Sequence, residues 1–312
     1  MRSKTIGILN RCFRLGSLLI LFIFTWFAVS TAAAQAYQPE WTSISLTGGG
    51  GQTCVLINGA VRCWGFSVKS GVPGSLDHPV PVAVNTLPAG IQQIASGNTH
   101  TCAITAASGV KCWGYNQQGM LGNGTYDTSQ TPVDVIGLAG AVKSIGMGYT
   151  HSCAVINATG AVQCWGLNAN GELGNTMGGT YNTPVNVTGL TGVKKVIGGG
   201  AHTCALLNSG ALKCWGYGYY GQLGNGTSGN TADTYIPQDV TGLDHGVVDV
   251  AAGYLSTCAL LDTGQVKCWG LLSALFANTP QNVAGLESGV TSLVMGSDHL
   301  CTLHAGGQVK CL

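Results

Sequence analysis

Short apolar runs separated by glycine-rich turns recur along most of this chain. In one unit, residues 200–226, two apolar runs at 203–207 and 211–215 flank an Asn-Ser-Gly turn. Apolar runs of about five residues around such a turn predict a β-hairpin. Each run contains a cysteine, so the pattern places Cys204 and Cys214 opposite each other across the predicted hairpin.

The same hairpin pattern occurs six times, and successive first cysteines are 48, 51, 51, 54 and 43 residues apart. This spacing defines repeats of about fifty residues. Two more apolar segments accompany most hairpins, and one of them begins at a proline, as at Pro132. Proline is tolerated on an edge strand or at a strand's first residue. Four short strands per repeat predict an all-β propeller with six blades.

The strand count falls one short of six complete blades. Six hairpins are accompanied by only five proline-led segments, and the sequence ends at Cys311-Leu312, where the other repeats continue with Trp-Gly. Two explanations stay open. Either one blade is incomplete, or the reading frame is cut short and the propeller has seven blades.

The N-terminus has the pattern of a secretory signal peptide. Four cationic residues precede an apolar run at residues 15–29, and small residues follow at 34–36. The small residues favour cleavage after Ala36 over retention as a membrane anchor, although the run approaches the shortest spanning length. We therefore expect a signal peptide at residues 1–36 and the propeller at residues 37–312.

Without this leader the chain has twelve cysteines in six evenly spaced pairs. Such a set predicts a disulfide framework in an oxidising compartment, which indicates a secreted or periplasmic protein. Because the cysteines of each hairpin are equally distant from its turn, pairing within repeats is favoured: Cys54–Cys63, Cys102–Cys112, Cys153–Cys164, Cys204–Cys214, Cys258–Cys268 and Cys301–Cys311. Zinc binding is disfavoured because no Cys-x-x-Cys motif occurs.

Three motifs recur in fixed order: Gly-x-x-His-Thr-Cys-Ala-Leu, Cys-Trp-Gly-Tyr-Asn and Gly-Gln-Leu-Gly-Asn-Gly. These motifs closely resemble the repeats of the regulator of chromosome condensation (RCC1) family over about residues 48–312. The resemblance implies a propeller, which has seven blades in that family. Nucleotide exchange, the role of its nuclear members, is not expected here because an exported chain has no access to their GTPase. The cysteine pairs are an addition to the family's pattern.

Two repeated side chains have both structural and functional interpretations. Four histidines share one motif position (His100, His151, His202 and His299). Hydrogen bonds to the backbone of a loop or neighbouring blade are favoured over a metal site on the axis. Five tryptophans follow a second cysteine (Trp64, Trp113, Trp165, Trp215 and Trp269). We favour a packing role between blades for these tryptophans. The alternative is light absorption, because a plant ultraviolet-B receptor of the same fold uses tryptophans as chromophores.

Residues that break the repeat pattern form the candidate binding surface. They are three tyrosines beside glycines in repeat four, a fourth tyrosine after an insertion, and apolar residues in repeat five: Tyr217, Tyr219, Tyr220, Tyr235, Leu272, Leu275 and Phe276. Tyrosine is common in binding surfaces for proteins and sugars, and an exposed apolar patch would mark a contact. Local repacking around the altered loops is an equally weighted alternative.

The net charge and the absence of catalytic motifs limit the functions that the sequence supports. The mature chain has nine Lys and Arg against twelve Asp and Glu, a net charge of −3, so it lacks a basic stripe for nucleic acid. No catalytic, metal or cofactor motif is evident, and Glu172 replaces the glutamine of a repeated motif. We expect an exported scaffold that binds an extracellular or periplasmic protein, as an inhibitor or adhesin does. A carbohydrate-binding module is the alternative, and an enzyme with acids at blade junctions is less favoured.

Overall fold

The computed structural model describes residues 44–312, except for residues 67, 68, 75, 76 and 274. The predicted signal peptide lies outside the described residues. The described part of the chain contains 23 strands in six antiparallel sheets. None of its residues belongs to a helix that is long and apolar enough to cross a membrane.

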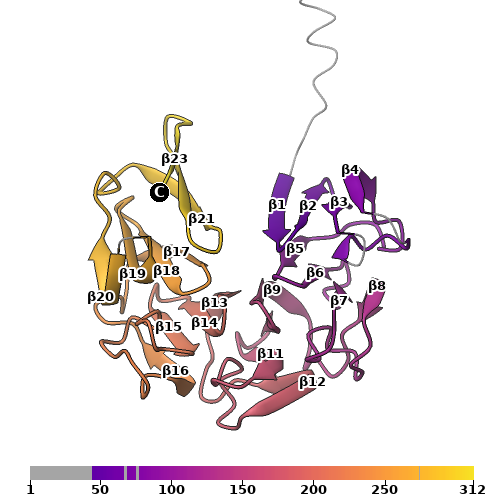
Figure 1. Ribbon diagram of the computed structural model, residues 1–312, viewed down its shortest axis with the longest axis horizontal. Coiled ribbons are helices and arrows are strands. Elements are labelled where there is room, and N and C mark those ends of the chain that lie inside the picture. Colours follow the sequence, from indigo (N-terminus) through magenta and orange to yellow (C-terminus); the bar gives the residue numbers. More distant parts are fainter. Residues whose placement is uncertain (1–43, 67–68, 75–76, 274) are drawn as a thin grey trace, which may run out of the picture. The chain divides into compact units, whose positions relative to one another are not determined.

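Each sheet is one propeller blade, and its strands run from the axis outward in chain order (Figure 1). The first strands are β1 (Ile44–Gly49), β5 (Gln93–Ser96), β9 (Val142–Met147), β13 (Val193–Gly198), β17 (Val247–Ala252) and β21 (Val290–Met295). The second strands are β2 (Gln52–Ile57), β6 (His100–Ile104), β10 (His151–Ile156), β14 (His202–Leu207), β18 (Ser256–Leu261) and β22 (Leu300–His304). The third strands are β3 (Ala60–Gly65), β7 (Val110–Gly114), β11 (Val162–Asn168), β15 (Leu212–Gly216), β19 (Val266–Leu272) and β23 (Val309–Cys311). The fourth strands are β4 (His78–Ala83), β8 (Ser129–Asp134), β12 (Gly179–Asn186), β16 (Thr234–Asp239) and β20 (Leu275–Asn282).

This architecture confirms the predicted all-β propeller of six blades. Successive first strands contact one another around the axis, from β1 to β21. The sixth sheet contains only β21, β22 and β23 among the described residues, in agreement with the strand count of the sequence. The five other sheets contain four strands each.

The second and third strands of every blade form the predicted cysteine hairpin. In the fourth blade Cys204 lies opposite Cys214, and the turn between them closes with Gly210 at a φ of +83°. This left-handed conformation is accessible to glycine without strain. All six disulfides predicted within repeats are present: Cys54–Cys63, Cys102–Cys112, Cys153–Cys164, Cys204–Cys214, Cys258–Cys268 and Cys301–Cys311.

The hydrophobic core consists of separate clusters between neighbouring blades. In the cluster between the third and fourth blades, the fully buried Trp215 packs with Val155 and Leu173 of the preceding blade. A Cβ at Gly174 would lie 2.8 Å from Nε1 of Trp215, so the backbone passes too close to the indole for any larger residue. Trp113, Trp165 and Trp269 are equally buried, which supports the packing interpretation of the repeated tryptophans.

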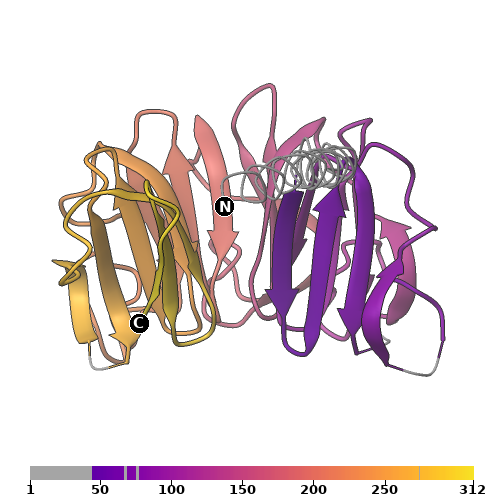
Figure 2. The same cartoon turned by 90° about the horizontal axis from the view of Figure 1, so that it is seen from above.

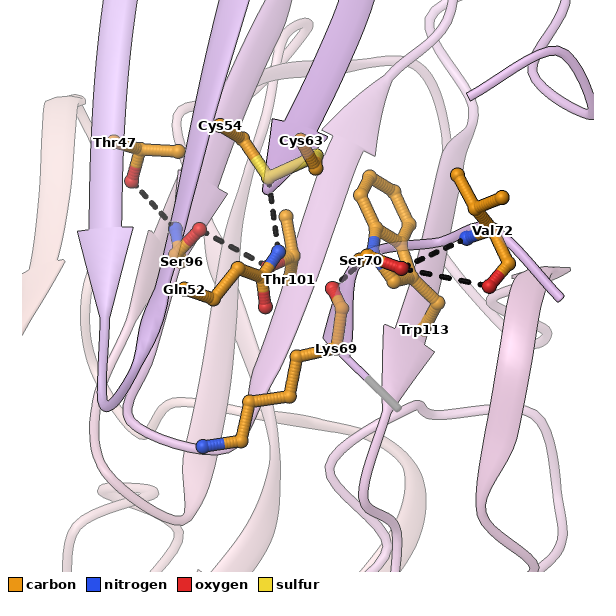
Figure 3. The surroundings of a disulfide bond; sticks show 10 residues. All are labelled: Thr47, Gln52, Cys54, Cys63, Lys69, Ser70, Val72, Ser96, Thr101 and Trp113. Atoms are coloured by element: carbon orange, nitrogen blue, oxygen red, sulfur yellow. Dashed lines mark hydrogen bonds between the residues drawn. A yellow bond between two sulfur atoms is a disulfide. The ribbon is translucent and has the colours of Figure 1, made fainter. Parts of the chain in front are cut away.

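A polar contact joins each of the first four blades to the next one. It connects the residue two positions before the first cysteine with a hydroxyl one position before the first cysteine of the next blade. The pairs are Gln52–Thr101 at 3.0 Å, His100–Ser152 at 2.7 Å, His151–Thr203 at 2.9 Å and His202–Thr257 at 2.9 Å. Figure 3 shows the first of these junctions, where Gln52 and Thr101 lie beside the Cys54–Cys63 disulfide. We call this series the interblade relay.

The relay corrects the expectation for the repeated histidines. His100, His151 and His202 do contact the neighbouring blade, but their partners are side-chain hydroxyls and not the expected backbone groups. His299 is largely exposed, with Nδ1 3.5 Å from Oδ1 of Asp298. Among the described residues, no group of three or more His, Cys, Asp and Glu side chains is arranged to hold a metal ion.

The first and sixth blades expose positions that the other blades bury against a neighbour. Leu46 is 66% exposed, whereas its equivalents in the five other blades are buried (Ile94, Ile145, Val196, Val250 and Leu293). Val309 of the sixth blade is 65% exposed, although its equivalents are buried too (Val61, Val110, Val162, Leu212 and Val266). Burial of these positions therefore depends on an adjacent blade.

Candidate functional site

Three of the candidate tyrosines form one cluster. Tyr217, Tyr219 and Tyr220 directly follow β15, and their ring centroids lie 6.3, 6.3 and 5.0 Å apart. The insertion at residues 227–234 holds this loop, because the Gly218 N–H donates to Oδ1 of Asp233 over 2.9 Å. A Cβ at Gly218 would lie 2.3 Å from the carbonyl oxygen of Ala232, so glycine lets the two segments meet.

Tyr235 has a different role from this cluster. It lies in β16, and its hydroxyl donates over 2.9 Å to the carbonyl oxygen of Ala169 in the third blade's outer connection. This contact ties the fourth blade to the preceding one. Tyr235 is half-buried, and it acts as a link between blades within the tyrosine-bearing region.

The apolar residues of repeat five separate into core and surface. Leu272 is only 6% exposed and packs with Leu286 and Val290, and Leu275 packs partly buried against the same cluster. The proposed surface was therefore wrong for Leu272. Leu272 stands four residues after the second cysteine, where Asn116 and Asn168 of other blades are also buried, and it pairs with Leu275 in β20. Phe276 does face solvent, with 60% of its surface exposed.

Two further tyrosines complete the cluster, and the sequence reasoning missed both. Tyr149 and Tyr254 come from the third and fifth blades, and their ring centroids are 4.7 Å apart. The hydroxyls of Tyr149 and Ser297 lie 2.8 Å apart, and the N–H of Tyr254 donates to the carbonyl oxygen of Ser297 over 2.7 Å. A signal was present, because both tyrosines stand four positions before a first cysteine, where the other repeats have Gly, Asn or Ser.

Tyr217 links the tyrosines of repeat four with the pair formed by Tyr149 and Tyr254. The pKa of Tyr217 is raised, first by burial and then by the neighbouring Tyr220, Asp233, Tyr219 and Tyr254. Backbone contacts join Tyr217 to the pair at the axis, because its N–H donates to the carbonyl oxygen of Ala201 over 2.8 Å and the adjacent Gly200 N–H donates to that of Tyr254 over 3.1 Å. We call the whole set the tyrosine–aspartate patch: Tyr149, Tyr217, Tyr219, Tyr220, Tyr254, Asp233 and Asp298.

A cavity of about 530 Å³ opens beside this patch at the propeller axis. Its lining comes from first strands and the loops that follow them, with Tyr149, Tyr254, Met147 and Met295 among the side chains. Many of the other lining positions are glycines of the same loops. The cavity thus gives the patch a recessed border.

All nine described tyrosines lie near one end of the sheets, which we call the tyrosine end. At this end first strands lead into second strands and third strands lead toward fourth strands, and it is the lower edge in Figure 2. The residues are Tyr115, Tyr126, Tyr149, Tyr181, Tyr217, Tyr219, Tyr220, Tyr235 and Tyr254. The exposed Phe66 and Phe276 belong to the same end. The cysteine-hairpin turns at the opposite end contain no aromatic residue.

The carboxylate of the buried Glu172 accepts hydrogen bonds from a residue of its own loop. Its carboxylate accepts bonds of 2.9 Å from both the backbone N–H and the side-chain amide of Asn170. Burial raises its pKa despite these bonds, and the charge of Asp233 acts in the same direction. Gln222 takes the equivalent place in the next repeat and accepts from the Tyr220 N–H over 3.0 Å. The structure thus gives Glu172 the same structural role as the glutamine.

Stacked four-stranded blades, cysteine-tryptophan hairpins and glycine-rich connections define a β-propeller built from repeats of one type. A model of the regulator of chromosome condensation (RCC1) repeat matches residues 110–155, 159–206 and 209–260, and a second model of this repeat matches residues 91–119, 142–172 and 193–222. The chain belongs to the RCC1 repeat family.

Curated relatives cover much of this chain. The ultraviolet-B receptor UVR8 of Arabidopsis thaliana is 30% identical over 258 residues, which are 78% of this chain and 56% of the receptor. Protein pim1 of Schizosaccharomyces pombe is 32% identical over 239 residues, 68% of this chain and 43% of that protein. The human E3 ubiquitin-protein ligase HERC2 is 31% identical over 238 residues, 72% of this chain and 5% of the ligase. The chain thus spans little more than half, or less, of these relatives.

Solved structures show the same fold. Human WBSCR16 superposes with a TM-score of 0.75 at 22% identity, covering 86% of this chain and 76% of that one. Prp20p of Saccharomyces cerevisiae gives a TM-score of 0.74 at 21% identity, covering 86% and 71%. At these identities the likeness concerns the fold.

Proposed function

We propose that this protein is an exported, disulfide-linked propeller scaffold that binds another protein through its tyrosine end. The observation that carries the proposal is the gathering of all nine described tyrosines at that end. Tyrosine supplies a large amphipathic contact area and loses little conformational entropy on binding. Rigid blades hold the loops, so little further ordering opposes association.

Export is supported by the leader pattern and by the six disulfides, which persist in oxidising compartments. An exported scaffold would meet extracellular or periplasmic proteins and not a nuclear GTPase, so the proposal does not include nucleotide exchange. It assigns no enzymatic activity and no cofactor. Inhibitor-like and adhesin-like roles both fit a rigid surface of this kind.

An affinity capture tests this function. The oxidised protein, residues 37–312, is immobilised and exposed to the envelope fraction and culture fluid of its native cell. We expect one protein to be retained by the wild type and lost in a Tyr217→Ala, Tyr219→Ala, Tyr220→Ala variant. An Asn208→Ala, Ser209→Ala variant changes the opposite end of the same blade and is the matched control.

Two outcomes contradict the proposal. Retention that survives the triple substitution, or that is lost equally in the control, would remove the tyrosine cluster from the binding surface. Tyrosine-dependent binding on a glycan array, without any captured protein, would favour the carbohydrate-binding alternative. Equal thermal unfolding of both variants ensures that a loss reflects the surface and not the fold.

A further inference from the structure

The tyrosine–aspartate patch is continuous across four blades. Tyr149 of the third blade touches Tyr254 of the fifth and Ser297 of the sixth. The loop at residues 199–201 joins this pair to repeat four, because the Tyr217 N–H donates to the carbonyl oxygen of Ala201 over 2.8 Å and the Gly200 N–H donates to that of Tyr254 over 3.1 Å. The ring of Tyr217 stacks with that of Tyr219 at an interplanar angle of 8°. Asp298 directly follows Ser297. The patch therefore combines aromatic rings with the carboxylates of Asp233 and Asp298.

These two carboxylates differ from the three aspartates of the blades that pair with lysines. Asp134, Asp239 and Asp249 each form an ion pair with a lysine, at 2.6–2.7 Å. Among the described residues neither Asp233 nor Asp298 forms an ion pair with a lysine or arginine within 4.0 Å. Oδ1 of Asp233 accepts the Gly218 N–H, and the 89% exposed side chain of Asp298 lies 3.5 Å from Nδ1 of His299. Their negative charge is left for an external cation.

The described loops at the tyrosine end offer no exposed lysine or arginine to compete with that cation. Their exposed or half-buried charged side chains are Asp77, Asp127, Asp233, Asp298 and His299. Lys69 is the one cationic lysine in these loops, and its ammonium group is turned inward to the carbonyl oxygens of Gly50 and Asn98. The end as a whole therefore combines aromatic surface with negative charge.

Lys69 itself shows how this surface accommodates a cation. Its Nζ lies 5.4 Å from the ring centroid of Phe66 and 5.8 Å from that of Tyr115. A cation at such distances is attracted by the negative face of an aromatic ring. The tyrosine–aspartate patch has the same aromatic component and adds carboxylates, but it contains no cation of its own among the described residues.

We propose that the tyrosine–aspartate patch binds an arginine- or lysine-rich segment of the partner protein. The guanidinium or ammonium groups would lie over Tyr219 and Tyr254 and pair with Asp233 and Asp298. Carboxylates form strong charge-assisted bonds with such groups, and arginine also stacks on aromatic faces. This inference rests on the proposed protein-binding function and specifies the chemistry of its partner.

Binding of short peptides to the oxidised protein, residues 37–312, tests the inference. The probes are fluorescein-labelled twelve-residue peptides of alternating Gly and Arg, Gly and Lys, or Gly and Glu, measured by fluorescence anisotropy. We expect saturable binding of the cationic peptides and none of the acidic one. Affinity should fall as salt rises from about 50 to about 300 mM, because screening weakens exposed charge pairs.

Matched variants locate the binding. We expect Asp233→Asn with Asp298→Asn to weaken binding of the arginine peptide about tenfold, and Tyr219→Ala with Tyr254→Leu to weaken it to a similar extent. Asp244→Asn with Glu287→Gln removes two charges from the opposite end and should leave the affinity within about twofold. Asn retains an acceptor for the Gly218 N–H, so the first variant preserves the loop.

The inference is overturned if the arginine peptide does not bind, or if the Asp244 and Glu287 variant loses as much affinity as the patch variants. Its failure is distinguishable from failure of the proposed function. A partner captured in a tyrosine-dependent manner, but insensitive to the Asp233 and Asp298 substitutions, would preserve the scaffold and remove the cation selectivity. Loss of tyrosine-dependent capture would remove the scaffold function itself.

Discussion

Nε2 of His202 lies 2.9 Å from Oγ1 of Thr257, which directly joins the fourth blade to the fifth. The Thr257 hydroxyl gives its single proton to the carbonyl oxygen of Gln222, 2.9 Å away. His202 must therefore donate through an Nε2–H, and its buried Nδ1 has no partner among the described residues. The same carbonyl also accepts from Nε1 of Trp269, so the relay and the tryptophan share one acceptor.

The first prediction concerns this donor. We expect His202→Gln to change the free energy of unfolding by less than about 1 kcal/mol, because Gln52 makes the same bond in the first blade. His202→Ala should cost about 2–3 kcal/mol, since it leaves a cavity and a buried hydroxyl without its donor. Equilibrium denaturation of the oxidised protein measures both. Equal losses in the two variants would show that the hydrogen bond contributes nothing.

The second prediction is acid sensitivity of the relay. Burial lowers the pKa of His100 to about 3, of His151 to about 4 and of His202 to about 3. The neutral form is therefore favoured in the folded state, and the unfolded chain binds more protons between pH 6.5 and these values. Stability is fully present above about pH 6.5 and falls as pH decreases toward 4, by up to about 1.4 kcal/mol per pH unit for each histidine.

A variant with His100, His151 and His202 all replaced by Gln should lose this slope. Glutamine keeps the donor and does not titrate near these pH values. Denaturation midpoints measured between pH 7 and pH 4 compare the two proteins. An unchanged pH profile in the glutamine variant would assign the acid sensitivity to other groups.

The third prediction concerns the one junction where the relay is broken. Ser256 holds the donor position of the fifth blade, but its buried hydroxyl has no partner among the described residues. The acceptor position of the sixth blade, one before its first cysteine, is Leu300, which is fully buried and has no hydroxyl. Ser256→Gln should therefore bury an amide without its relay partner and lower the free energy of unfolding by about 1–3 kcal/mol. The exposed Ser209→Gln is the control. An unchanged or raised stability for Ser256→Gln would show that the amide finds another acceptor at this junction.

The fourth prediction concerns Glu172. Burial raises its pKa, so the folded state binds more protons than the unfolded chain just above pH 4.5, and stability falls as pH rises through the folded pKa. Glu172→Gln removes this cost, and the equivalent Gln222 shows that the site accepts an amide. We expect the variant to be more stable at neutral pH and equal to the wild type below pH 4.5. A stability gain that persists in acid would refute the electrostatic cause.

Most of the fold could be predicted from sequence patterns within single repeats. The cysteines of each hairpin are equidistant from a short turn, so their register, and with it the disulfide, follows from the sequence. The burial of Leu272 was not predicted, although its equivalents Asn116 and Asn168 are buried as well. The position within the repeat decides whether a side chain faces the core, and apolarity by itself does not show the direction.

Only the part of the candidate site that is contiguous in sequence could be predicted. Tyr217, Tyr219 and Tyr220 are neighbours in sequence, so their cluster was found directly. Tyr149 and Tyr254 are more than a hundred residues apart, and they meet only because the curvature of the propeller brings the loops of different blades together at the axis. The spacing within one repeat contains no information on that curvature.

The interblade relay also has a direction, and this affects how such a chain can evolve. The second, third and fourth repeats each carry a donor for the repeat that follows and a hydroxyl for the repeat that precedes. A gene segment that encodes one repeat therefore encodes both halves of a junction, and tandem duplication would add a blade without any new contact chemistry. Selection on the loops can then act separately from selection on the contacts between blades.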